Sequence, residues 1–165
     1  MHAPQIRDEE GIQRPLIPFD HQRDIWGAWD AGGSVLIVKA RQTGISTGIM
    51  AAVAHDLAHG KSTLVISRKQ DVAQHLAGIC KTLYETAIYE GKPRVIRSNL
   101  QELVVQGGAR VIVETASQSA GRGYTVQRLV LDEFAHMPWQ DQIWTSAMPT
   151  AAKHGNVCVL STPNG

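Results

Sequence analysis

The chain has 165 residues, 43% of them hydrophobic, and a formal net charge of +1. This is enough apolar sequence for one domain with a sizeable core, and the near-balanced charge does not by itself indicate a nucleic-acid-binding protein. No apolar run approaches the roughly 20 residues of a membrane span, and the N-terminus lacks the features of a signal peptide. Cys80 and Cys158 are far apart in sequence, so we expect both to be buried and reduced, as in a cytoplasm.

The N-terminal part of the chain predicts an arm and then the start of a domain. Residues 1–18 contain three prolines, which favour an extended arm, and we place one domain at residues 19–165. Asp20 has a side chain suited to cap a helix. The short helix that it would begin carries the apolar residues Ile25, Trp26 and Trp29.

A strand, a polar loop and a helix follow, in an order typical of an anion-binding site. The apolar run 35–38 predicts a buried strand, and Ser46 or Thr47 opens an Ala-rich helix that reaches about residue 59 before Gly60 ends it. The first N–H groups of such a helix are unpaired and its dipole is positive there, so the loop predicts a site for an anion. The loop residues are small, polar or basic: Lys39, Arg41, Gln42, Thr43 and Gly44.

The register of this loop resembles a Walker A phosphate loop with two departures. Gly44 and the hydroxyl of Ser46 stand where that pattern needs them. Lys39, however, occupies the place of its first glycine, and Ile45 occupies the place of its lysine. Lys39, which would reach across from the start of the loop, is one candidate for the missing positive charge. Arg41 is the other, because a planar guanidinium suits phosphate oxygens.

The middle of the chain alternates strand and helix patterns. Residues 62–67 predict a second strand, and the runs 103–105 and 111–113, joined through a Gly-Gly pair, predict a β-hairpin. Between them lies a helix whose apolar face comprises Val72, Leu76, Ile79, Leu83 and Ala87. Residues 91–128 hold six Lys or Arg against two Glu, which fits contact with phosphates and, equally, a solvated surface.

Two adjacent carboxylates end the next apolar run. Residues 128–131 predict a parallel strand buried on both faces, and Asp132 and Glu133 would emerge at its carboxyl end, where ligands bind in open α/β sheets. Asp132 is suited to hold Mg²⁺ beside the Ser46 hydroxyl, while Glu133 would orient and polarise an attacking water. Taken alone, the pair is equally typical of solvated acids after a strand. The upstream loop favours the catalytic interpretation.

The last predicted elements are a helix near residues 139–152 and a strand at 157–160, which runs into Ser161 and Thr162. A polar Ser-Thr pair at the tip of a buried strand suits contact with a γ-phosphate or its water. The Pro-Asn-Gly sequence that follows is ordinary turn chemistry.

A pair of histidines resembles part of a zinc site. His55 and His59 lie four residues apart on the predicted helix, as in a zinc-protease motif with Asp for Glu, but no third ligand is evident. Both fall in the last turns of the helix, where the dipole favours cationic side chains, and we favour that interpretation.

Together these motifs resemble the ATPase half of the large terminase subunit, the motor that packages DNA into the procapsids of tailed bacteriophages. The Lys-first, Arg-Gln-containing loop is the most specific part of the match, which spans about residue 19 to the C-terminus. The resemblance implies a P-loop NTPase of the additional-strand catalytic-glutamate type, with a mostly parallel sheet flanked by helices. The matched motifs are Lys39-Ala40-Arg41-Gln42-x-Gly44-x-Ser46-Thr47, Leu131-Asp132-Glu133 and Ser161-Thr162-Pro163-x-Gly165.

The resemblance also implies roles for individual residues. Gln22 would read the adenine edge, Glu133 would be catalytic, and Ser46 and Asp132 would hold Mg²⁺. Arg122, in a Gly-flanked loop ten residues before Asp132, would be an arginine finger acting in cis or in trans. The alternative, independent of the resemblance, is that Arg122 pairs locally with Glu114 or with a strand-end carbonyl. The implied ATP-binding set is Gln22, Lys39, Arg41, Gln42, Thr43, Gly44, Ile45, Ser46, Thr47, Ser161 and Thr162.

The partners implied by the resemblance are double-stranded DNA, a portal protein and a small terminase subunit. A homo-oligomeric ring in the host cytoplasm, transiently at the procapsid portal and without a membrane, would be the working assembly. A large terminase subunit also has a nuclease domain, whose sequence is not part of this chain, so we do not assign the nuclease activity of the family to it. The alternatives are a helicase-type nucleic-acid motor and a nucleotide-binding domain without turnover.

Overall fold

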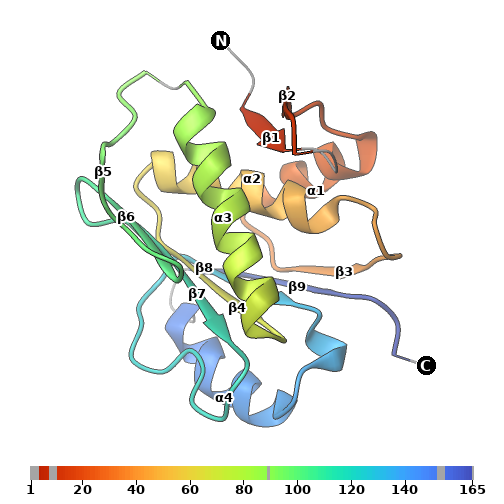
Figure 1. The fold of residues 1–165 in the computed structure, drawn as a ribbon. Helices are drawn as coiled ribbons and strands as arrows, with labels where there is room; N and C mark the ends of the chain where they lie inside the picture. The colour runs from red at the N-terminus through yellow and green to blue at the C-terminus, as the bar shows by residue number, and fades with distance from the viewer. Residues whose placement is uncertain (1–3, 8–10, 89, 152–154, 165) are drawn as a thin grey trace.

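The computed structural model describes residues 4–7, 11–88, 90–151 and 155–164. The main strands are β3 (Val35–Val38), β4 (Thr63–Ser67), β5 (Val95–Ser98), β6 (Glu102–Val105), β7 (Arg110–Thr115), β8 (Arg128–Asp132) and β9 (Asn156–Ser161). They form one sheet in the order β3-β9-β8-β4-β7-β6-β5 (Figure 1). Neighbours from β3 to β7 are parallel, and β6 and β5 add antiparallel at the far edge.

Helices cover both faces of this sheet. α1 (Asp20–Asp30), α2 (Ile45–Ala58) and α3 (Gln70–Thr86) lie on one face, and α4 (Gln140–Ala151) lies on the other (Figure 1). The connections β3-α2-β4 and β8-α4-β9 cross the sheet in opposite directions, so right-handed crossovers place their helices on opposite faces. Side chains of β4 alternate between the two cores.

Strand β9 is inserted between β3 and β8, the strands that lead to the phosphate-loop and acidic motifs. This position confirms the predicted α/β sheet with an additional strand. The register aligns Val38 with Ser161 and Asp132 with Leu160, so the three strands end side by side. Their carboxyl ends therefore bring residues from distant parts of the sequence to one edge of the sheet.

The prediction that Asp20 caps the first helix is wrong. The N-cap of α1 is Phe19, and Asp20 is the first helical residue. The Asp20 side chain is not the cap. The cap contact comes from Gln22, in the first turn of the helix, whose Oε1 accepts a hydrogen bond from the Phe19 N–H at 2.9 Å.

Two further features were absent from the sequence-based prediction. The N-terminal arm contains a hairpin of β1 (Gln5–Arg7) and β2 (Gln13–Pro15), and the Gln5 N–H donates to Thr86 Oγ1 of α3 at 2.8 Å. Strand β5 extends the predicted β6-β7 hairpin into three antiparallel strands. Helix α2 begins at Ile45, one residue before the predicted start.

A buried carboxylate outside the acidic motif links several elements of the fold. Asp56 of α2 is 1% exposed and accepts hydrogen bonds from Trp29 (2.7 Å), Arg128 (2.8 Å) and Lys61 (2.9 Å). Burial opposes ionisation of this carboxyl, but the three donors outweigh burial and lower its pKa. The charged Asp56 therefore links α1, α2 and β8.

None of the helices in the described ranges combines the length and the apolar character that crossing a membrane requires. Cys80 and Cys158 are buried and not joined by a disulfide, as predicted. Burial raises the pKa of each thiol to about 12.

Candidate active site

The loop between β3 and α2 turns sharply because two of its residues adopt the left-handed conformation. Gln42 has φ 60° and Gly44, the N-cap of α2, has φ 72°. The Thr43 hydroxyl donates to the Ala40 carbonyl at 3.2 Å across the turn. This geometry presents the first N–H groups of a 14-residue helix to whatever anion occupies the loop.

Helix α1 braces this loop through Gln22. The buried Gln22 side chain donates from Nε2 to the Gly44 carbonyl at 2.8 Å. It also lies against Gly48, where an added Cβ would be 3.1 Å from Gln22 Cγ. Both ends of the amide are therefore engaged with the backbone, at Phe19 and at Gly44. Contact of Gln22 with an adenine stays a prediction.

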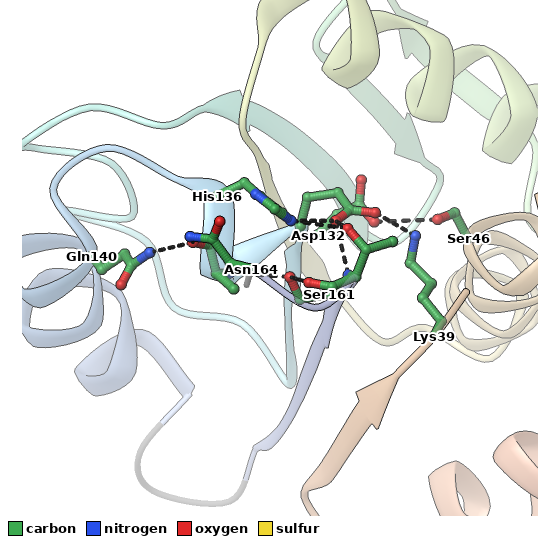
Figure 2. Close-up of polar contacts among 10 residues, drawn as sticks. Lys39, Ser46, Asp132, His136, Gln140, Ser161 and Asn164 are labelled. Carbon is green, nitrogen blue, oxygen red and sulfur yellow. Dashed lines mark hydrogen bonds and ion pairs between the residues drawn. The ribbon is translucent and has the colours of Figure 1, made fainter. Parts of the chain in front are cut away.

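Ile45, at the position where a Walker A loop has lysine, packs into the hydrophobic core beneath α2. Its side chain is buried, so its means of holding an anion is the backbone N–H at the helix start. The basic side chains of the loop are Lys39 and Arg41, and Lys39 lies in the cluster of polar contacts that Figure 2 shows, through its hydrogen bond to Glu133. Arg41 is exposed.

Lys39 and Glu133 form the central contact of the site. Lys39 Nζ donates to Glu133 Oε1 at 2.5 Å, although 94 residues separate them (Figure 2). The Lys39 side chain is 10% exposed and that of Glu133 is 25% exposed, so the pair is partly shielded from solvent. A charge-assisted hydrogen bond of this kind is stronger than one between neutral groups.

Glu133, directly after β8, has an unusual backbone conformation. Glu133 has φ 57° and ψ 43°, a left-handed conformation that costs energy for a residue other than glycine. Glu133 Oε2 accepts from both the backbone N–H (3.0 Å) and the hydroxyl (2.9 Å) of Thr162. Burial opposes its ionisation, but the hydrogen bonds from Lys39 and Thr162 outweigh burial and lower the pKa of Glu133.

Ser161, which we predict to contact phosphate, supports the turn after Glu133 in the structure. Its Oγ accepts from the Ala135 N–H at 3.2 Å and donates to the Thr162 carbonyl at 2.9 Å. The Ala135 carbonyl accepts from Gln140 and from Asn164 (Figure 2). These contacts fix β9 to the short helix 134–136 and leave phosphate contact by Ser161 as a prediction.

His136 is a site residue that sequence reasoning missed. Its Nε2 lies 2.9 Å from Thr162 Oγ1 and 3.9 Å from Glu133 Oε2. The available signal was a histidine three residues after the catalytic candidate. Nothing in the sequence indicated that the chain turns back there and brings His136 against Thr162.

The residues predicted to hold Mg²⁺ lie together. Ser46 Oγ donates to Asp132 Oδ1 at 3.2 Å. Ser67 is level with Asp132 on the adjacent strand β4, and its buried hydroxyl has no hydrogen bond of good geometry among the described residues. The Ser67 hydroxyl oxygen therefore lies close to the Ser46 hydroxyl and the Asp132 carboxylate. Hard cations prefer such oxygen ligands, so Ser46 and Asp132 suit Mg²⁺.

The pKa of Asp132 is raised, chiefly by burial and also by the neighbouring Glu133, while Lys39 and the hydroxyls of Ser46 and Ser67 oppose this rise. A cation at this position would stabilise the ionised carboxylate. Within the described ranges, no group of three or more His, Cys, Asp or Glu is arranged to hold a metal ion, and this includes the surroundings of His55 and His59.

Arg122 is set apart from the cluster. It is exposed, in the loop between β7 and β8, and its side chain makes no hydrogen bond or ion pair with any residue that the structure describes. Glu114, its suggested local partner, instead accepts hydrogen bonds from the Gly121 N–H and the Tyr124 hydroxyl. The structure therefore contradicts local pairing of Arg122 with Glu114.

The fold is that of large terminase ATPase domains. The ATPase domain of the Thermus phage P74-26 large terminase, in a mutant form, matches 91% of this chain with a TM-score of 0.68 and 22% identity. The large terminase of a thermophilic bacteriophage, in complex with ATP-γ-S, matches 90% with a TM-score of 0.67 and 12% identity. A DEAD box protein from Methanococcus jannaschii matches 90% with a TM-score of 0.61 and 11% identity.

These likenesses concern the fold, because all three identities are low. The chain spans 67% of the P74-26 ATPase domain, 39% of the large terminase with ATP-γ-S and 44% of the DEAD box protein. A search of protein-family models found none that matches the chain.

Proposed function

We propose that this chain is an ATP-hydrolysing motor domain of a phage DNA-packaging terminase large subunit. One observation carries the proposal: Lys39, Glu133 and Thr162, from the ends of β3, β8 and β9, form one hydrogen-bonded cluster beside Ser46 and Asp132. A cation, a water-directing carboxylate and a metal-binding pair at a helix N-terminus are the parts that phosphoryl transfer needs. Support comes also from solved neighbours named as terminases, two of them in complex with ADP or ATP-γ-S.

Each part of the cluster has a role in this proposal. The N–H groups at the start of α2 and the side chain of Lys39 or Arg41 hold the β- and γ-phosphates. Ser46 and Asp132 hold Mg²⁺, which neutralises charge on the phosphate oxygens. Glu133, kept ionised by Lys39 and Thr162, accepts a hydrogen bond from the attacking water and aligns it with the γ-phosphorus.

Thr162 and Gln22 link this chemistry to the rest of the fold. Thr162 donates two hydrogen bonds to Glu133, so the residue that follows β9 is fixed to the proposed water-directing carboxylate. Gln22 joins α1 to the start of α2 through Gly44 and also reads the adenine edge in the proposed complex.

Arg122 completes the proposed site from a neighbouring subunit. An exposed arginine whose side chain has no partner among the described residues suits a finger that stabilises charge on the transferred phosphoryl group. The motor then works as a homo-oligomeric ring. Its partners are double-stranded DNA, a portal protein and a small terminase subunit, and it acts in the host cytoplasm and transiently at the procapsid portal.

Subunit mixing tests this assignment. Arg122→Ala and Glu133→Gln subunits are each expected to be inactive as ATPases. Mixed oligomers, confirmed by sedimentation, should recover activity because one interface then holds an intact Arg122 and an intact Glu133. Absence of recovery at every mixing ratio would rule out action in trans.

The likeness to a DEAD box protein favours a helicase-type motor as the second candidate function. A helicase separates duplex strands in an ATP-dependent reaction, whereas a packaging motor moves along intact double-stranded DNA. Strand separation by the wild-type protein would support the helicase. ATP binding without hydrolysis, measured separately, would instead identify a nucleotide-binding domain without turnover.

A further inference from the structure

We propose that Glu114 is a positioning residue that holds Arg122 ready for the neighbouring active site. This inference rests on the proposed function of Arg122. Glu114 Oε2 accepts from the Gly121 N–H and Oε1 accepts from the Tyr124 hydroxyl, both at 2.8 Å. The two donors stand on either side of Arg122, so one carboxylate closes the loop that carries the arginine.

Helix α4 holds the same loop from its other side. The Ser146 hydroxyl donates to the Ala120 carbonyl at 2.7 Å. Gly121, with φ +84°, lies so close to α4 that an added Cβ would be 2.7 Å from the Ala147 Cβ. The segment before Arg122 is therefore fixed by both Glu114 and α4, while Arg122 itself remains exposed.

The position of Glu114 in the sheet connects this loop to the catalytic edge. Glu114 is level with Ile66 of β4, and the next residue of β4, Ser67, is level with Asp132. Helix α4 follows the short helix 134–136 that begins after Glu133. Glu114 and α4, which hold the Arg122 loop, are therefore both connected through the backbone or the sheet to the edge that carries Asp132 and Glu133.

A carboxylate is suited to this task because both donors need an acceptor. Two oxygens, one for the Gly121 N–H and one for the Tyr124 hydroxyl, satisfy both without rearrangement. The hydrogen bond to Glu114, aided by burial, raises the pKa of Tyr124, as expected for a hydroxyl that donates to a carboxylate. Glutamine also fits, since its carbonyl accepts from Gly121 and its amide donates to the tyrosine oxygen, whereas alanine removes both contacts.

Complementation between subunits distinguishes a positioning role from a general structural one. We expect Glu114→Ala to lower kcat by about 10²-fold with unchanged ATP affinity, because misplacing a catalytic group costs roughly that much. Glu114→Gln should restore most of the activity. A mixture of Glu114→Ala and Glu133→Gln subunits should recover activity, as the mixture of Arg122→Ala and Glu133→Gln does, because the Glu133→Gln subunit supplies a correctly placed Arg122. A mixture of Glu114→Ala and Arg122→Ala subunits should stay inactive, because neither supplies one. Complementation by Arg122→Ala, or none by Glu133→Gln, would overturn the proposal.

Limited trypsin digestion supplies a readout that needs no ATPase activity. Cleavage after Arg122, followed by mass spectrometry, should be roughly tenfold faster in Glu114→Ala than in the wild type or Glu114→Gln, because the loop opens more often. Glu85→Ala is the matched control, since Glu85 is an exposed carboxylate of α3, on the other face of the sheet, and pairs with Lys81 instead. Equal cleavage in all four proteins would refute the positioning role even if the ATPase assays failed, while an inactive wild type would refute the proposed function.

Discussion

Replacing Lys39 is the most direct perturbation of the candidate site. In the proposed complex this lysine makes one hydrogen bond to a phosphate oxygen, and in the structure it makes another to Glu133 at 2.5 Å. The side chain is 10% exposed, so water replaces neither contact well. Hydrogen bonds to charged groups contribute about 1.5–3 kcal/mol each. The two together predict a loss of about 3–6 kcal/mol in transition-state stabilisation for Lys39→Ala.

That loss corresponds to a decrease of about 10²–10⁴-fold in kcat/KM for ATP hydrolysis. Steady-state phosphate release, with ATP affinity measured separately, gives the two parameters. Lys69→Ala is the matched control, because Lys69 is an exposed lysine outside the cluster and its removal should change kcat/KM by less than about twofold. Equal activity in the two variants would refute the role of Lys39, and a large loss confined to Arg41→Ala would assign the charge to Arg41.

Other contacts of the fold and the site lead to three more expected outcomes. Glu133→Gln should bind ATP and Mg²⁺ normally but hydrolyse ATP about 10²–10⁴-fold more slowly, and near-native kcat would contradict its role. Asp56→Ala should lower the free energy of unfolding by about 3–5 kcal/mol in urea titration, because it leaves Arg128 buried without its carboxylate. The pKa of Asp56 is lowered in the folded state. The ionised carboxylate therefore stabilises the fold fully above the ordinary pKa of 3.8, and this stabilisation is lost as pH falls through the folded-state pKa. Asp56→Asn should show a shallower loss of stability in acid than the wild type. Cys80, with a thiol pKa of about 12 and full burial, should resist iodoacetamide at about pH 8 until the protein unfolds, which mass spectrometry measures.

Much of the fold could be predicted from local pattern, because the central strands are short apolar runs and their connections contain helices. A run such as 128–131 needs burial on both faces, which a parallel sheet between helices provides. Strand β5 was not predicted, because all four of its residues are exposed and its sequence shows no buried face. Its place at the sheet edge comes from pairing with β6, which is a long-range property.

The grouping of the site could also be predicted, but its internal contacts could not. Parallel strands end at one edge, so motifs that follow β3, β8 and β9 must meet there. The contact of Lys39 with Glu133 depends on the left-handed backbone at Glu133, which nothing in the Leu-Asp-Glu-Phe sequence indicates. The second role of Gln22, as a brace for Gly44, likewise depends on the path of α1 across the start of α2.

A lysine at position 39, with isoleucine at position 45, places the positive charge on a different element of the proposed site. A lysine at the first residue of α2 would extend over the phosphates from the helix, but here that position is an isoleucine buried in the core. The lysine instead stands at the end of β3, where its backbone N–H donates to the Ser161 carbonyl of β9 at 3.0 Å and its side chain reaches Glu133. If Lys39 rather than Arg41 supplies the phosphate-binding charge, that charge is attached to the same strand pair that holds Glu133. In the proposed complex, loss of the γ-phosphate would leave Lys39 to bond Glu133 alone, and the contact between them would link the state of the nucleotide to Thr162, the residue that follows β9.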